Sequence, residues 1–275
     1  MHVRSSLEAV VGRGGVRSAL ASGELVRFGQ RVLVARDRML DFPTRCAAAL
    51  LWAGSEAVLA RETALRLFGC TAAGVGSVHL LVPYSVTLNP RPGVSVHHGR
   101  VGDVRSVDGL RCQALDAALC DVLCRGDRHV ALACADEALG RMPMATRAEL
   151  KAELSGQINR RSDTRGVRRG RELLGLATGV PPSPQRSRLL LTLVDAGLPV
   201  PAQGYEVRSG VDDEEPVHYA WPAARLALHY GSARCLPGWT VLRADDADLR
   251  NPTRLITRLK RALRSGADAP ARAGA

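Results

Sequence analysis

The stretch that decides the fold of this 275-residue chain is PVHYAWPAARLALHYGSARCLPGWTVLRADDAD, at residues 216–248. Apolar and polar residues alternate on both sides of residues 222–225, which is typical of two short strands joined by a turn. If the turn is centred there, the two residue numbers of every facing pair add up to the same value. The predicted facing pairs are Trp221 with Leu226, Tyr219 with Leu228 and His218 with His229. A third strand is expected at residues 238–243.

The frame of this stretch resembles the C-terminal domain of actinobacterial proteins related to very-short-patch-repair endonucleases, in the PD-(D/E)xK nuclease superfamily. Three motifs carry the resemblance: AWP at residues 220–222, RLA at residues 225–227 and GWTVLR at residues 238–243. A helix opening SPQRSRL at residues 183–189 matches the family's Ser-Pro-Leu-Glu-Ser-Arg-Leu. The resemblance implies a nuclease-like α/β domain with a mixed sheet.

The acidic residues at the family's metal site are replaced in this chain. The family has Asp before the AWP motif and Glu-Tyr-Asp-Gly on the next strand, where this chain has His218, His229 and Gly231. A helix glutamate near the metal has become Arg186, and the loop at residues 232–238 is shorter than the family's. Mg²⁺ prefers oxygen ligands, and imidazole does not suit it. The resemblance therefore implies a degenerate nuclease domain, for which we expect no catalytic residue, no metal and no cofactor.

Alternative interpretations keep a metal site open. Carboxylates gather at residues 212–215 and again at Asp245, Asp246 and Asp248, and a relocated site built from them would make the chain a metal-dependent endonuclease. Zinc is a second possibility, because histidine and cysteine are its usual ligands. The candidate zinc sets are His218, His229 and Cys235, and Cys124, His129 and Cys134. We favour neutral, hydrogen-bonded histidines and buried cysteines in both places.

Residues 1–36 are predicted to form two short helices and a β-hairpin. We expect helices at residues 6–11 and 16–22, a turn at residues 12–15, and strands at residues 25–28 and 32–34. This order, with LVR at residues 25–27, resembles the N-terminal winged helix-turn-helix domain of abortive-infection type IV antitoxins. The resemblance implies that the chain binds double-stranded DNA. Arg13, Arg17 and Ser18 would meet the groove or its phosphates, and Arg27 and Arg31 the flanking backbone.

Residues 37–175 are predicted to form an α+β middle domain. Helices are expected at residues 42–53, 61–68, 114–123, 128–140 and 146–157, and strands at residues 77–83, 94–98 and 104–111. His97 and His98 are neighbours on a strand and point to opposite faces, so we expect surface or edge residues and no joint site. The basic run at residues 160–171 includes Arg168 and Arg169, which we expect to contact a nucleic-acid backbone. A solvated linker face is the alternative for this run.

The composition favours an anionic partner. Lys and Arg total 38 against 27 Asp and Glu, which gives a formal net charge of +11. Arginine-rich coding is the competing explanation, because only Lys151 and Lys260 are lysines. The seven cysteines have no C-x-x-C spacing, which is typical of buried thiols in a reducing compartment. No apolar run approaches the ~20 residues that span a bilayer, so we expect a cytoplasmic protein without a membrane partner.

Glycine and prolines at residues 176–184 predict a domain boundary, followed by the degenerate endonuclease-like domain at residues 183–265 and a disordered tail at residues 266–275. The predicted fold class is therefore α/β, with a winged helix-turn-helix first, an α+β middle region and a nuclease-like domain last. These observations indicate a non-catalytic DNA-binding protein, either a transcriptional regulator or the antitoxin of a type IV toxin–antitoxin pair with a cognate toxin as partner. A protein-interaction module is the alternative outside nucleic-acid binding.

Overall fold

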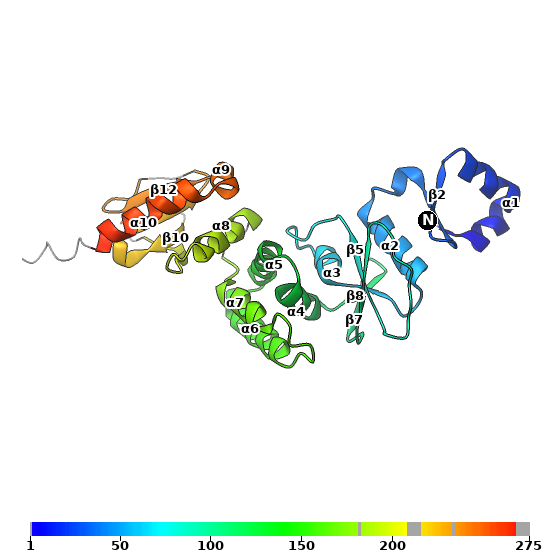
Figure 1. Ribbon diagram of the computed structural model, residues 1–275, viewed down its shortest axis with the longest axis horizontal. Coiled ribbons are helices and arrows are strands. Elements are labelled where there is room, and N and C mark those ends of the chain that lie inside the picture. Colours follow the sequence, from blue (N-terminus) through cyan, green and yellow to red (C-terminus); the bar gives the residue numbers. More distant parts are fainter. Residues whose placement is uncertain (1, 181–182, 208–215, 233–234, 268–275) are drawn as a thin grey trace, which may run out of the picture. The chain divides into compact units, whose positions relative to one another are not determined.

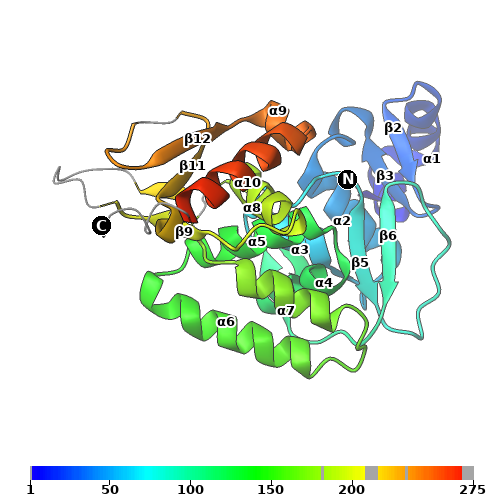
Figure 2. The ribbon, with the colours of Figure 1, turned by 60° about the vertical axis from the view of Figure 1, so that its left-hand side comes forward.

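The structure is a computed structural model that describes residues 2–180, 183–207, 216–232 and 235–267 (Figures 1 and 2). Helices and mixed sheets alternate along the chain, which confirms the α/β class. The chain forms two compact units, Met1–Val122 and Leu123–Ala275. The predicted middle domain at residues 37–175 therefore extends over both units. Within the described residues, every helix is too short or too polar to cross a bilayer.

The N-terminal segment forms the predicted helices and hairpin, with one correction. The helix α1 (Arg4–Ala21) is interrupted at Gly12, whose φ of 75° and ψ of 160° are not helical. The turn predicted at residues 12–15 is wrong in extent, because one residue with positive φ redirects the chain and the following glycines stay helical. The hairpin consists of β2 (Leu25–Phe28) and β3 (Val32–Ala35). A strand that was not predicted, β1 (His2–Val3), pairs with β3, so the order in the sheet is β1-β3-β2.

A five-stranded mixed sheet forms the rest of the first unit, in the order β6-β5-β4-β8-β7. Its strands are β4 (Val58–Leu59), β5 (Val78–Val82), β6 (Val94–His98), β7 (Val104–Val107) and β8 (Leu110–Gln113). The predicted strand at residues 104–111 is instead the hairpin β7–β8, turned at Asp108 and Gly109, whose positive φ values suit a tight turn. The helices α2 (Phe42–Ala53) and α3 (Arg61–Leu67) pack against this sheet, and Asp41 caps α2 by accepting a hydrogen bond from the Thr44 amide.

Helices dominate the first half of the second unit. They are α5 (Arg128–Gly140), α6 (Met144–Asn159), α7 (Val167–Leu176) and α8 (Pro184–Asp195), preceded by α4 (Leu115–Arg125). Asp127 and Ser183 cap α5 and α8, as the sequence predicts for Ser183. The helices α6 and α7 lie side by side in both views, and α5 packs against α8. This packing places the first turn of α8 beside the C-terminal sheet.

The C-terminal sheet has the predicted register. The strands β10 (Val217–Trp221) and β11 (Leu226–Tyr230) are antiparallel, with Tyr219 opposite Leu228 and Trp221 opposite Leu226. The strand β12 (Thr240–Ala244) pairs with β11 in parallel, and β9 (Ala202–Tyr205) pairs with β10, so the sheet is mixed. The sequence did not indicate β9 or the short helix α9 (Asp246–Arg250).

The last helix, α10 (Thr253–Ala267), contacts β11, β12 and the 3-10 turn Pro222–Ala224 (Figure 2). Leu255 and Leu259 are buried, which anchors the helix on the sheet. The predicted tail at residues 266–275 is wrong for its first two residues, because they continue α10. A helix already held by packing extends through a glycine at a cost of only about 1 kcal/mol. Residues 268–275 lie outside the described residues.

A buried carboxylate ties α5 to α8 and to the connection between α7 and α8. Asp136 is 1% exposed and accepts hydrogen bonds from the Thr178 and Gly179 amides, at 2.9 and 3.1 Å, and from the Ser187 hydroxyl, at 2.6 Å. Burial raises the pKa of Asp136, against the effect of these hydrogen bonds. Gly179 has a φ of 72°, and a Cβ there would lie 2.7 Å from the Gly140 nitrogen. The segment predicted as a domain boundary at residues 176–184 is therefore anchored inside the second unit.

Replacing this carboxylate should destabilise the second unit strongly. We expect Asp136→Ala to lower the free energy of unfolding by about 3 kcal/mol, because three buried donors lose their acceptor. Asp195→Ala is the matched control on α8, since its exposed ion pair with Arg128 contributes at most about 1 kcal/mol. Urea unfolding followed by circular dichroism measures both values. Equal losses for the two variants would contradict the role of Asp136.

Candidate functional site

The register of the C-terminal sheet brings two histidines together. His218 on β10 and His229 on β11 have ring centroids 5.0 Å apart, tilted by 57°. His229 is 6% exposed, whereas His218 is half-buried. The amide of Tyr230 donates a hydrogen bond to Nδ1 of His218 at 2.9 Å, so this nitrogen is unprotonated. The resemblance implies carboxylates at these two positions, and in this chain the imidazole rings of His218 and His229 face each other there.

Arg186 adds a positive charge to this pair. It lies in the first turn of α8, and its carbonyl accepts a hydrogen bond from the buried Tyr219 hydroxyl at 2.6 Å. Burial lowers the pKa of His218 from 6.5 to about 4, and the charge of Arg186 and the neighbouring His229 add to this shift. The site therefore disfavours a cation, which is the opposite of what a divalent metal ion requires.

Gly231, the fourth replaced position, follows β11 directly. Its φ is 86°, and its amide donates a hydrogen bond to the Ala244 carbonyl at 2.9 Å. Space around it is open, because a Cβ would meet nothing within 4 Å. An aspartate at this position would nevertheless be strained, because L side chains rarely adopt this backbone conformation.

The zinc interpretations are wrong for the residues that the structure describes. Among them, no group of three or more His, Cys, Asp or Glu side chains could hold a metal ion. Cys235 is exposed, and Cys124 and Cys134 are buried thiols. The prediction of buried cysteines is confirmed at every position except Cys235.

The described acidic residues near β12 have a structural role. Asp245 accepts hydrogen bonds from the Ala247 and Asp248 amides, and Asp248 accepts one from the Asp245 amide, which together form a capping box for α9. Asp246 accepts a hydrogen bond from the Tyr230 hydroxyl. The other acidic group predicted for a relocated site, at residues 212–215, lies outside the described residues.

The five candidate DNA-contacting residues of the N-terminal segment are exposed. Arg13, Arg17 and Ser18 lie on α1 after the kink, and Arg27 and Arg31 lie on the hairpin and its turn. Among the described residues, the side chains of these four arginines form no ion pair and no hydrogen bond. Their charge is therefore available to an anionic partner.

Several arginines of the basic run at residues 160–171 are engaged by the chain itself. Arg168 pairs with Glu172 at 2.9 Å, Arg125 and Arg165 pair with Asp163, and Arg169 donates a hydrogen bond from Nε to the Leu123 carbonyl at 3.2 Å. The exposed side chain of Arg168 can still reach a ligand. Arg169 is half-buried and held by the backbone, so we remove it from the candidate contacts.

A stronger cationic surface lies on α10, where the sequence analysis named no site. Its exposed cations have no ion-pair or hydrogen-bond partner for their side chains in the described part of the chain; they are Arg254, Arg258, Lys260, Arg261 and Arg264. The helix contains no acidic residue. The sequence carries this signal, because basic residues at 254, 258 and 261 recur at helical spacing along one face.

A pair of histidines in the first unit was also missed. Nδ1 of His79 on β5 lies 3.0 Å from Nε2 of His97 on β6 and 3.6 Å from a Glu62 carboxylate oxygen. The expectation of a surface or edge position is confirmed, because β6 is an edge strand of the sheet; His98 is exposed, and His97 is half-buried and stacked on His79. Burial lowers the pKa of His79, since the side chain sits between two strands and α3.

The fold and this site define an α/β protein of two units with a histidine pair on its C-terminal sheet. No family model matches the chain. It is 30% identical over 261 residues to an uncharacterized protein of Mycobacterium tuberculosis, MT2308 in strain CDC 1551 / Oshkosh and Rv2248 in strain H37Rv. The match covers 88% of this chain and 93% of the relative. The chain belongs to the family of this mycobacterial protein.

Acidification should destabilise the fold through His218. Between pH 6.5 and about 4, the unfolded chain binds a proton at this residue and the folded chain does not, so stability falls as the pH decreases. His218→Asn keeps a hydrogen-bond acceptor for the Tyr230 amide and cannot titrate. Between pH 7.5 and pH 4.5 we expect the free energy of unfolding of this variant to fall by about 1 kcal/mol less than that of the wild type. The difference is small because solvent screens the half-buried ring. Thermal unfolding at both pH values, with the exposed His98→Asn as control, measures the difference, and equal pH dependence in wild type and His218→Asn would refute it.

Proposed function

We propose that this chain is a non-catalytic DNA-binding protein, with an N-terminal winged helix-turn-helix and a degenerate nuclease-like domain. The observation that carries the proposal is the set of exposed, unpaired arginines on α1 and the following hairpin. Arg13 and Arg17 are one helical turn apart, as expected of side chains that enter a groove together. The hairpin presents Arg27 and Arg31, which suit the flanking phosphates.

The cationic face of α10 supports the same partner from the second unit. A duplex backbone carries regularly spaced phosphates, and unpaired cations gain affinity by releasing the counterions that these phosphates condense. The five exposed cations of α10 have no carboxylate on their own helix to compete with DNA. We therefore propose Arg254, Arg258, Arg261 and Arg168 as separate DNA contacts of the second unit.

The composition of the histidine site supports the non-catalytic part of the proposal. Metal-dependent phosphodiester cleavage needs oxygen ligands that hold the ion and orient water. His218, His229 and Arg186 offer two imidazoles and a guanidinium instead. The described carboxylates nearby are engaged in capping α9, so they do not favour the alternative of a relocated endonuclease site.

The resemblance to type IV antitoxins extends the proposal to regulation. A transcriptional regulator or antitoxin would bind its own promoter, and an antitoxin would in addition have a cognate toxin as protein partner. Co-purification of the chain with the product of a neighbouring toxin gene would favour the antitoxin over the simple regulator. Binding of a protein without any affinity for DNA would favour the alternative of an interaction module.

DNA binding should depend steeply on salt and on specific arginines. We expect the affinity for a duplex of its own promoter to fall by about a hundredfold or more between about 50 and 200 mM salt. Arg17→Ala should weaken binding by about fivefold, and the triple variant Arg254→Gln, Arg258→Gln, Arg261→Gln should in addition flatten the salt dependence. Fluorescence anisotropy measures these values. Arg105→Gln, on an exposed and unpaired arginine of β7, is the control and should change little. Failure to bind either promoter or generic duplex would overturn the proposal.

Purified protein should not cleave DNA in the presence of Mg²⁺ or Mn²⁺. Loss of electrostatic elements of this kind costs about a hundredfold or more each. His218→Asp with His229→Glu restores two carboxylates on facing strands, and Gly231 is left unchanged because of its positive φ. We expect this double variant to bind a divalent ion, seen by calorimetry, without nicking plasmid DNA, because Arg186 stays beside the site. Metal-dependent nicking by the wild type that disappears on substitution of Asp212 or Asp213 would establish a relocated site.

A further inference from the structure

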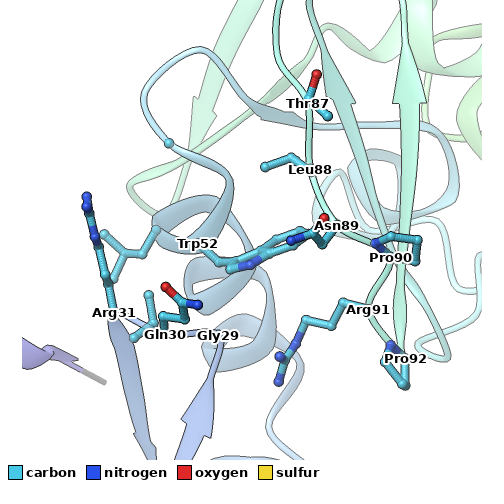
Figure 3. Close-up of a pocket in the computed structure, with 13 residues that line it drawn as sticks. Gly29, Gln30, Arg31, Trp52, Thr87, Leu88, Asn89, Pro90, Arg91 and Pro92 are labelled. Carbon is cyan, nitrogen blue, oxygen red and sulfur yellow. The ribbon is translucent and has the colours of Figure 1, made fainter.

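A pocket of about 610 Å³ opens in the first unit. Three segments form it: the hairpin turn at residues 29–32, the end of α2, and the loop at residues 87–92 (Figure 3). Its volume is typical of sites for small molecules and cofactors.

Trp52 provides a flat aromatic surface in this pocket. Figure 3 shows its ring system extending from α2 toward Asn89 and Pro90. The hairpin turn holds the indole in place, because a Cβ on Gly29 would lie only 2.4 Å from Cδ1 of Trp52. The residue is half-exposed, and its N–H has no hydrogen-bond partner among the described residues. A fixed, partly exposed indole is a stacking platform for a planar ring.

The charged residues that line the pocket are both arginines. Arg31 is exposed at one side of the pocket and unpaired in the described structure, and no Asp or Glu lines the wall. Arg91 lies with its guanidinium carbon 4.0 Å from the centre of the Phe28 ring and donates a hydrogen bond from Nη2 to the Arg27 carbonyl at 3.2 Å. Its Nε is buried and has no partner among the described residues. An anionic group in the pocket would balance the charges of the two arginines.

Two side-chain amides complete the polar lining. Gln30 lies on the hairpin turn and Asn89 on the opposite loop, so they face the pocket from two sides (Figure 3). Each amide offers both a donor and an acceptor, and neither is hydrogen-bonded within the described residues. Such amides can recognise the edge of a heterocycle that stacks on Trp52.

We propose that this pocket binds a nucleoside phosphate, with its base stacked on Trp52 and its phosphate at Arg31, while the charge of Arg91 adds to the positive potential of the pocket. An inorganic anion would use the arginines but leave the indole uncovered, whereas an apolar ligand would leave two cations and two amides unpaired. A nucleoside phosphate satisfies all three features at once. The pocket shares Arg31 with the proposed DNA contacts, but Trp52, Asn89 and Arg91 belong to none of them, so the inference can be tested apart from DNA binding.

Isothermal titration calorimetry of the full-length chain tests the ligand class. The probes are the four ribonucleoside 5′-monophosphates, adenosine, and inorganic phosphate. We expect at least one monophosphate to bind about tenfold or more tightly than adenosine and than phosphate, since stacking and charge each contribute about 1–3 kcal/mol. Binding of none of the nucleotides at millimolar concentration would overturn the proposal. Equal binding of phosphate alone would also overturn it, because the site would then be an anion site only.

Variants of the pocket locate the binding. Trp52→Ala should weaken binding of the best nucleotide by about tenfold or more, and Trp52→Phe, which keeps an aromatic face, should recover part of that loss. Arg31→Gln should weaken the nucleotide without affecting adenosine. Arg100→Gln, on an exposed and unpaired arginine outside the pocket, is the matched control. Circular dichroism melting verifies that each variant is folded. Unchanged nucleotide affinity in folded Trp52→Ala and Arg31→Gln would place the ligand elsewhere and refute the inference.

Discussion

The buried carboxylate of Asp136 is the constraint on which the second unit depends. It accepts two amide hydrogen bonds from the connection before α8 and one hydroxyl hydrogen bond from α8 itself. A charged group at 1% exposure is stable only when such partners surround it, so α5, the connection and α8 hold one arrangement. This arrangement in turn sets the first turn of α8, and with it Arg186, beside His218. Asp136, which lies outside the candidate site, therefore fixes the position of Arg186 and with it the positive charge beside His218.

Positive or neutral nitrogen groups occupy the places where the resemblance to nucleases implies carboxylates. The consequence extends beyond the loss of a metal ligand, because Arg186 and burial keep His218 neutral at physiological pH. A neutral His218 that packs against His229 and accepts a hydrogen bond from the Tyr230 amide needs no ion for its stability. The sheet thus keeps its frame, including the buried Tyr219 and Trp221, without carboxylates at these positions. The proposed DNA contacts lie outside this site, on α1, the N-terminal hairpin and α10.

Local patterns predicted the strand pair of the C-terminal sheet and most of the helices. The alternation around Pro222 was enough to place Tyr219 opposite Leu228, because register in a hairpin follows from its turn. The strand β9 was not predicted, because it is separated from its partner β10 by many residues in the sequence and its own residues have little β-propensity. The hydrogen bond from Arg169 to the Leu123 carbonyl could not be predicted either, because tertiary packing brings these two residues together. The sequence alone shows the basic residues of α10 and the lack of carboxylates among them, so this surface could have been predicted.

Hydrogen–deuterium exchange of the full-length chain with and without duplex DNA tests the central claim most directly. If the chain binds DNA through its exposed cations while the degenerate site is only structural, DNA should slow exchange in α1, the hairpin β2–β3 and α10. The strands β10 and β11, with His218 and His229, should exchange at the same rate in both states. Protection confined to β10 and β11, with none on α1 or the hairpin, would contradict this account.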